Sequence, residues 1–99
     1  MAGSLAVKAL IEFLGTTFFL GAILATAGMT LQFALVGAAL ATAIFVGGLF
    51  GGAGHLNPAV TTMILTRGGI DVPTWGAYVA AQVLGGLTAS YGVRAVLHK

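Results

Sequence analysis

Apolar residues form long blocks along this chain, and few charged residues interrupt them. The first block covers about residues 5–27 and the last about residues 73–97. A helix that crosses the hydrocarbon core of a bilayer needs about 20 mostly apolar residues. Each block therefore predicts a membrane-spanning helix. We interpret the first block as a retained span rather than a signal peptide, because no Ala-x-Ala cleavage pattern clearly ends it.

The middle of the chain carries no charged residue from Gln32 to Thr66, a stretch of 35 positions. A continuous helix of that length would measure about 50 Å, too long for one crossing of a ~30 Å core and too short for two. Paired glycines and then Asn57-Pro58 also interrupt the stretch. We therefore expect a second span over about residues 33–49, followed by a re-entrant loop and half-helix over about residues 50–66.

The residues at the start of the predicted half-helix favour a helix N-terminus. Asn57 has the chemistry of an N-cap, and Pro58 suits the first helical position. Lipid cannot satisfy the backbone groups that a helix leaves free when it starts inside the membrane. Such backbone is tolerated where protein buries it or where it lines a watery cavity, as in channels and transporters. The predicted fold is an all-α integral membrane protein, one domain over residues 1–99 with three spans and one re-entrant half-helix.

The composition agrees with a protein whose solvent is lipid. Hydrophobic residues make up 59% of the chain and charged residues 6%, whereas soluble domains contain about 25% charged residues. The net charge of +2 forms no basic stripe, so nucleic acid is not an expected partner. The chain contains no cysteine, and His55 has no ligand partner at metal-binding spacing. We expect no metal, no cofactor and, without a nucleophile–base pair or phosphate loop, no enzymatic activity.

Three motifs resemble the aquaporins and glycerol facilitators, the major intrinsic protein family, and they occur in that family's order. Residues 12–16, Glu-Phe-Leu-Gly-Thr, are similar to the opening of the family's first helix. Residues 54–61, Gly-His-Leu-Asn-Pro-Ala-Val-Thr, are similar to its first Asn-Pro-Ala loop, and residues 81–86 to its third helix. The resemblance covers nearly the whole chain and implies a passive channel for water and for glycerol or other small neutral solutes.

The resemblance also implies a role for each part of the loop. The pore motif is Asn57, Pro58 and Ala59, where the half-helix start and the amide of Asn57 would orient water and oppose proton hopping. The backbone carbonyls of Ala53, Gly54 and His55 would form a polar ladder along the pore. The selectivity region falls on Val60, where the family's second motif is followed by Arg, and on Gly37 and Ala38. These small or uncharged residues predict a wider, less selective mouth.

Glu12 is the single acid within a predicted span, and three interpretations of it are open. By resemblance it accepts hydrogen bonds from the loop near His55; alternatively it is a proton-coupling site, or it pairs with Lys8 one helical turn away. Gln82 is expected either to hold the same loop from the third span or to make an ordinary bond between helices.

Family members contain two inverted repeats, whereas this chain contains one. Lys8 and Arg67 lie on one predicted side of the membrane and Arg94 and Lys99 on the other, so the bias that fixes orientation is nearly balanced. We therefore expect the chain to insert in both orientations and to pair in the bilayer as an antiparallel homodimer. The resemblance further suggests four pores per assembly, hence eight chains.

Other functions are also open at this stage. A small proton-coupled exporter of dual topology would use Glu12, but the three-span count and the Asn-Pro-Ala motif do not fit that class. The chain could also be half of a split channel whose other half is a different polypeptide, or a truncated repeat that assembles with a full-length channel.

Overall fold

The computed structural model describes residues 3–99, which form α-helices and no strands. The helices are α1 (Leu5–Ala25), α2 (Gln32–Leu49), α3 (Pro58–Thr66) and α4 (Val72–Leu97). The expected all-α class is confirmed. α1 ends two residues before the apolar block does, because the chain turns after Ala25 and Gly28 takes a positive φ of 85°.

The helix ends follow from local chemistry. The Ser4 side chain accepts a hydrogen bond from the Val7 N–H at the start of α1 (3.2 Å). Asp71 does the same at the start of α4, where its Oδ1 accepts the Thr74 N–H (2.9 Å). α2 stops because Gly51 has a φ of 87°, a conformation that favours glycine and turns the chain out of the helix.

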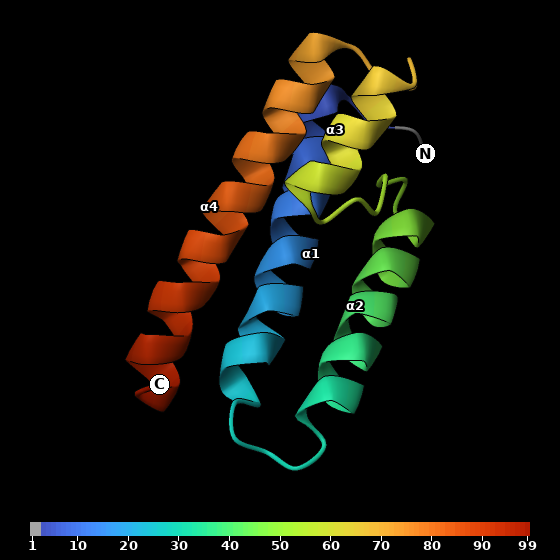
Figure 1. Cartoon of the computed structure of the whole chain (residues 1–99). Helices are drawn as coiled ribbons and strands as arrows, with labels where there is room; N and C mark the ends of the chain where they lie inside the picture. The colour runs from blue at the N-terminus through green and yellow to red at the C-terminus, as the bar shows by residue number, and fades with distance from the viewer. Residues whose placement is uncertain (1–2) are drawn as a thin grey trace.

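α1 lies between α2 and α4 and packs against both, while α3 packs against α4 (Figure 1). The bundle measures 40 × 25 × 24 Å, so it is elongated along the helices. The start of α1 and the end of α4 lie at opposite ends of this long axis (Figure 1). An odd number of crossings would produce this arrangement of the first and last helices.

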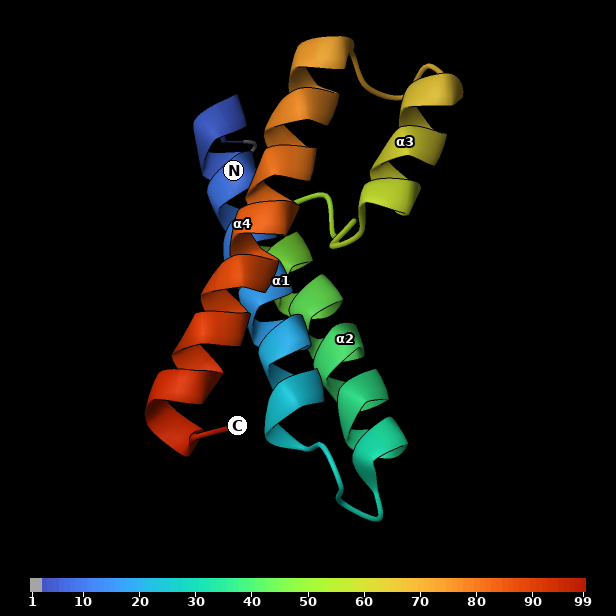
Figure 2. The ribbon, with the colours of Figure 1, turned by 60° about the vertical axis from the view of Figure 1, so that its left-hand side comes forward.

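α3 occupies only the end of the bundle that also holds the start of α1. Figures 1 and 2 show α2 running toward that end, a loop turning back, and α3 running toward the same end again. α3 has 9 residues against 18 in α2. The other half of the bundle, beyond the start of α3, is therefore built from α1, α2 and α4 without a fourth helix.

α1 and α4 approach each other closely because small residues face the contact. Ala81, Gly85 and Ala89 recur at every fourth position of α4, and all are buried. A Cβ added at Gly85 would lie 3.0 Å from the Phe13 carbonyl oxygen and 3.0 Å from the Thr16 Cβ. Stripes of small residues allow this close approach of helices in membranes.

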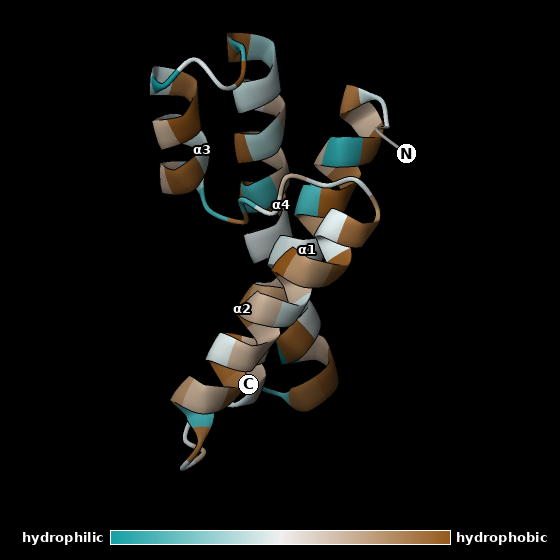
Figure 3. Cartoon of the chain, turned by 90° about the vertical axis from the view of Figure 1, so that its right-hand side faces the viewer, coloured by the Kyte–Doolittle hydropathy of each residue, from teal (hydrophilic) through white to brown (hydrophobic). Residues whose placement is uncertain are grey.

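The distribution of polarity is the reverse of that in a soluble protein. The side chains of Glu12, Thr16 and Thr61 are the largest ones that are completely buried in the described part of the chain. Large apolar side chains point outward, including Phe33 (91% exposed) and Phe45 (67% exposed). Figure 3 shows apolar colour along the outer faces of α1 and α2. An exposed apolar surface of this extent requires lipid or protein around it.

α1 and α2 are, within residues 3–99, the two helices long and apolar enough to cross a membrane by the combined criterion of length and hydropathy. α4 is longer, at 26 residues, but contains more polar side chains and more glycine. The third crossing, expected over about residues 73–97, therefore stays a prediction.

Candidate functional site: the loop between α2 and α3

The loop that precedes α3 contains two residues with positive φ angles, and other parts of the protein must stabilise this conformation. Gly54 has a φ of 69°, and Leu56, which is not glycine, has a φ of 55°. A left-handed conformation costs a residue with a Cβ roughly 1–2 kcal/mol. Leu56 keeps this conformation because its side chain is buried against α1. A Cβ added at Gly15 would lie 2.8 Å from the Leu56 Cδ2, so α1 leaves room there for the leucine.

Glu12 binds the loop from α1. Its carboxylate is completely buried, and its Oε2 accepts the His55 N–H at 3.1 Å. Its Oε1 accepts the Leu56 N–H at 2.8 Å. A buried carboxylate requires such partners, because without them its desolvation would cost several kcal/mol. Lys8, which the sequence offered as an alternative partner, is not among the groups bonded to Glu12.

Gln82 binds the same carboxylate from α4. Its Nε2 donates to Glu12 Oε1 (3.0 Å) and to Thr61 Oγ1 (2.8 Å). The Thr61 hydroxyl also lies 3.0 Å from the His55 Nδ1 and donates to the Asn57 carbonyl oxygen (3.3 Å). One buried network therefore connects α1, α4, the loop and the first turn of α3.

The bonds to Glu12 also determine which way the loop carbonyls face. No peptide bond in the described chain is cis, and in a trans peptide the N–H and C=O point in opposite directions. Because the N–H groups of His55 and Leu56 face Glu12, the carbonyls of Gly54 and His55 face away from it. The same reasoning does not extend to the carbonyl of Ala53, whose following N–H makes no bond to Glu12.

Asn57 caps α3. Its Oδ1 accepts the Ala59 N–H at 2.7 Å, and Pro58 occupies the first helical position. The two N–H groups of the Asn57 amide make no hydrogen bond within the described chain. Asn57, Pro58 and Ala59 are all exposed. The exposed start of α3 thus presents amide donors at the positive end of the helix dipole.

The residues expected to set selectivity are not gathered at one place in this chain. Val60 is half-buried in the first turn of α3, whereas Gly37 and Ala38 are exposed on α2. α2 and α3 do not pack against each other among the described helices. Gly37 and Ala38 lie in the half of α2 that is remote from α3 (Figure 1).

The sequence analysis gave no role to several residues that the structure brings to the site. Thr61 joins Gln82 to His55, the Tyr78 ring packs edge-on to the His55 ring with centroids 5.4 Å apart, and Thr16 is buried beside Gln82. The signal that could have found them is a spacing of four. Thr16 follows Glu12, Thr61 follows Asn57 and Gln82 follows Tyr78 by four positions, which places each pair on one helix face.

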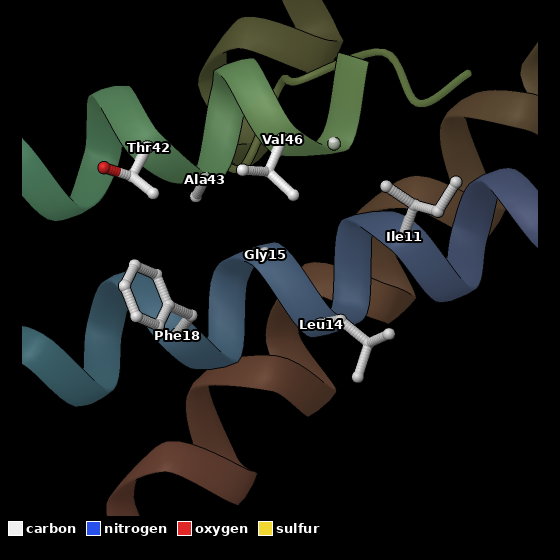
Figure 4. Close-up of a pocket in the computed structure, with 8 residues that line it drawn as sticks. Ile11, Leu14, Gly15, Phe18, Thr42, Ala43 and Val46 are labelled. Atoms are coloured by element: carbon white, nitrogen blue, oxygen red, sulfur yellow. The ribbon is translucent and has the colours of Figure 1, made fainter. Parts of the chain in front are cut away.

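The described chain has no metal-binding cluster, and the pocket between α1 and α2 is apolar. No group of three or more His, Asp or Glu side chains that could hold a metal ion occurs within residues 3–99. Figure 4 shows an apolar pocket of about 270 Å³ between α1 and α2, lined by Phe18, Thr42 and Val46 among others. The Thr42 hydroxyl donates its hydrogen to the Ala38 carbonyl oxygen (2.7 Å), so this hydroxyl offers a solute no free donor.

The apolar exterior, the two helices suited to crossing a bilayer and the buried polar network define an integral membrane protein. The model of the family described as "Major intrinsic protein" matches residues 4–99, and the chain belongs to this family. Members of this family are channels that lie in lipid and pass water and small solutes. They are not enzymes, which confirms the expectation from sequence.

Two curated relatives support the assignment. The chain is 40% identical over 93 residues to "Glycerol uptake facilitator protein-like 6" of Lactiplantibacillus plantarum, an alignment that covers 88% of this chain and 42% of that protein. It is 48% identical over 56 residues to "Probable aquaporin TIP4-1" of Oryza sativa subsp. japonica, covering 52% of this chain and 22% of the relative. The chain therefore spans less than half the length of either relative. No solved structure matches.

Proposed function

We propose that this chain forms one half of a transmembrane channel for water and for small neutral solutes such as glycerol, with a second, inverted copy completing the pore. The observation that carries the proposal is the orientation of the loop. Glu12 binds the N–H groups of His55 and Leu56, which directs the carbonyls of Gly54 and His55 away from the bundle core.

The loop and the start of α3 supply both kinds of hydrogen-bonding group that a water pore needs. The carbonyls of Ala53, Gly54 and His55 are the proposed acceptors, and the Asn57 amide is the proposed donor at the narrowest point. Two positive helix ends near the middle of the membrane would oppose cations. A water that accepts from both Asn57 amides cannot at the same point belong to a continuous proton wire, so protons would be excluded.

The helix lengths suit this placement. α1, with 21 residues, is about 30 Å long and matches the hydrocarbon core, while α3, with 9 residues, is about 14 Å long and reaches its middle. In the proposal α1, α2 and α4 span the membrane and α3 is re-entrant. Asn57 would then lie near the midplane, where the equivalent residue of an inverted copy would meet it.

An inverted second copy would supply the missing half. Basic residues are balanced between the two ends of the bundle, with Lys8 and Arg67 at one and Arg94 and Lys99 at the other. Because the basic residues of short loops set orientation, this balance would allow both orientations to occur. The proposed assembly of four such pores would contain eight chains.

The exporter alternative is less well supported. Such an exporter would need Glu12 to face a substrate or a proton pathway. Both oxygens of Glu12 instead accept donors from the protein, and the side chain is completely buried. The geometry favours a positioning role for Glu12.

The decisive experiment is stopped-flow light scattering of proteoliposomes that contain this chain alone. Asn57→Asp is the informative variant, because aspartate also caps helices but replaces the amide donors of Nδ2 with an acceptor oxygen. The matched control is Thr30→Asp, which introduces the same charge at an exposed position of the turn between α1 and α2, remote from α3. We expect fast water and glycerol flux from the parent chain and from Thr30→Asp, and a loss of at least tenfold in Asn57→Asp.

The same vesicles test the pairing. Cysteine-accessibility mapping is direct here, because the chain has no cysteine of its own. A single cysteine introduced beside Lys99 should be labelled from both sides of the membrane. If the inserted chain gave no flux and only one orientation, the pore would require a different partner polypeptide, and the homodimer would be rejected.

A further inference from the structure

A polar pocket of about 370 Å³ lies at the end of the bundle where α1 begins, α3 ends and α4 begins (Figure 1). Its lining consists of Leu5 and Lys8 of α1, Gly69 and Ile70 of the loop after α3, and Asp71, Thr74 and Tyr78 near the start of α4. The volume falls within the ~300–1,000 Å³ that is common for small-molecule sites. The pocket lies beyond the end of α3 that is opposite Asn57, so it is separate from the start of the half-helix.

The Tyr78 hydroxyl requires a partner from outside the chain. The residue is 3% exposed, and its hydroxyl makes no hydrogen bond within residues 3–99. Buried polar groups of native proteins nearly always have a partner. Long side chains on a helix point toward its N-terminus, which directs this hydroxyl toward the pocket. The oxygen is not among the fully enclosed atoms without a partner, so a group that enters the pocket can reach it.

The pocket also holds two opposite charges that do not neutralise each other. Lys8 is half-buried, Asp71 is exposed, and within residues 3–99 the two side chains form no ion pair. The Asp71 carboxylate caps α4 by accepting the Thr74 N–H. An ionised carboxylate has about four acceptor sites, so capping leaves room for a further donor. A ligand that carries both an anion and a hydrogen-bonding cation would complement this pair.

The depth of the pocket indicates where such a ligand comes from. α1 is about 30 Å long and matches the hydrocarbon core, so in the proposed insertion its first turn lies at one membrane surface. The start of α4 lies at the same end of the bundle (Figure 1). Trp75 lies in that first turn of α4, and tryptophan is enriched at the boundary between membrane and water. The groups present at this depth are phospholipid headgroups.

We propose that this pocket binds the headgroup of a phospholipid that carries a primary amine, with phosphatidylethanolamine as the simplest case. The Lys8 ammonium and the Tyr78 hydroxyl donate to the phosphate oxygens, and the Asp71 carboxylate accepts from the lipid ammonium. A choline headgroup has no N–H to donate, and an anionic headgroup without an amine is repelled by Asp71. The inference rests on the insertion of α1 and α4 described under the proposed function, but it does not require conduction.

The first test compares lipids that differ only in the amine. The parent chain in detergent is mixed with equal amounts of phosphatidylethanolamine and phosphatidylcholine that have the same acyl chains, and bound lipid is counted by native mass spectrometry. We expect the ethanolamine lipid to be bound at least fivefold more often. Lys8→Gln should reduce its binding at least fivefold. Arg67→Gln removes an exposed cation at the same end of the bundle but outside the pocket, and should have an effect of less than twofold. A Lys8→Gln chain that binds like the parent would overturn the proposal.

A second test removes the unpartnered hydroxyl. Tyr78→Phe keeps the ring that packs on His55 and removes an oxygen without a partner in the chain, so thermal stability in lipid-free detergent should not fall. Binding of the ethanolamine lipid should weaken about two- to tenfold, the equivalent of one hydrogen bond. Tyr91→Phe is the matched control, because Tyr91 is 70% exposed on the same helix and does not line the pocket. Equal binding by the two variants would show that the lipid does not bond to Tyr78.

A third test examines the site of the lipid ammonium. Asp71→Asn keeps a helix cap but removes the charge, so its binding of the ethanolamine lipid should fall to the level of the choline lipid. A preference that survived this change would reject Asp71 as the acceptor.

Two further comparisons separate this site from a soluble ligand and from the channel. Free phosphoethanolamine at the concentration of the lipid should not displace it, and displacement would assign the pocket to a soluble solute. A chain that conducts without preferring the ethanolamine lipid would reject this site alone, whereas a chain that binds the lipid without conducting would reject the channel alone.

Discussion

Glu12 and Gln82 are separated by 70 positions in the chain, yet the Gln82 Nε2 donates to the Glu12 Oε1 at 3.0 Å inside the bundle. This bond connects α1 to α4 at the level where α3 begins. Because the same carboxylate holds the loop, the two longest helices and the conformation of the loop are not independent. A change at Glu12 should therefore alter both the stability of the bundle and the geometry of the loop.

Replacing Glu12 with glutamine tests this coupling. The variant keeps the size of the side chain, but its amide nitrogen must face one of the three N–H donors that Glu12 now accepts. We expect a loss of roughly 1–3 kcal/mol in stability, the cost of leaving a buried donor unpaired. Thermal unfolding in detergent, followed by the fluorescence of the single tryptophan, Trp75, measures this loss.

Thr42→Val is a suitable control for the Glu12 variant. The Thr42 hydroxyl bonds only within its own helix and is exposed, so its removal should change stability by less than about 0.5 kcal/mol. Equal unfolding temperatures for Glu12→Gln and the parent chain would mean that the carboxylate does not hold the loop.

The positions of the helices were the part of the fold that the sequence predicted best. Each begins within one residue of the position that its apolar block or its cap predicts, because Asn57-Pro58 and the Asp71–Pro73 segment are strong starting signals. The crossing of the membrane by α4 stays a prediction, since hydropathy alone does not distinguish this helix.

The geometry of the site was harder to predict from the sequence than the helices were. The family resemblance led us to expect Glu12 and Gln82 at the same loop. The spacing of Glu12 and Thr16 predicts a shared helix face, but the spacing does not predict that this face meets Gln82. Leu56 in a left-handed conformation has no signature in the sequence, because residues with a Cβ rarely adopt it. The roles of the loop carbonyls and of Val60 in a pore stay predictions until flux is measured.

Gly85→Ala should separate α1 from α4. The added methyl group would lie 3.0 Å from the Phe13 carbonyl oxygen and 3.2 Å from the Thr17 backbone nitrogen, and backbone atoms cannot move aside as a flexible side chain can. We expect a loss of about 1–3 kcal/mol in stability. Gly92→Ala, on the same helix with no atom within 4 Å, should be neutral or stabilising. If the two variants unfolded at the same temperature, the close contact at Gly85 would be unimportant.

The start of α4 should be sensitive to acid. Hydrogen bonds from the Thr74 side chain and backbone N–H hold the pKa of the exposed Asp71 carboxyl below its ordinary value of 3.8. A depressed pKa in the folded state means that the cap stabilises the helix above pH 3.8 and loses this effect as the pH falls through the folded value. Asp71→Asn keeps the cap without a titrating group. Its unfolding temperature should fall less than that of the parent between pH 5 and pH 3, and an equal fall would assign the acid sensitivity to another group.

Val60→Arg should make the proposed pore more selective. Val60 is uncharged and half-buried in the first turn of α3, so the predicted mouth has no cation and is wide. A guanidinium there narrows the opening and adds fixed donors, which should obstruct glycerol more than the smaller water molecule. We expect glycerol permeability to fall at least tenfold and water permeability less than threefold in stopped-flow measurements. Thr66→Arg adds the same charge at the far end of α3 and should leave the ratio of the two permeabilities unchanged. If Val60→Arg reduced both permeabilities equally, the residue would lie outside the selective part of the pore, and the wide mouth would have to be formed by Gly37 and Ala38 of the opposite copy.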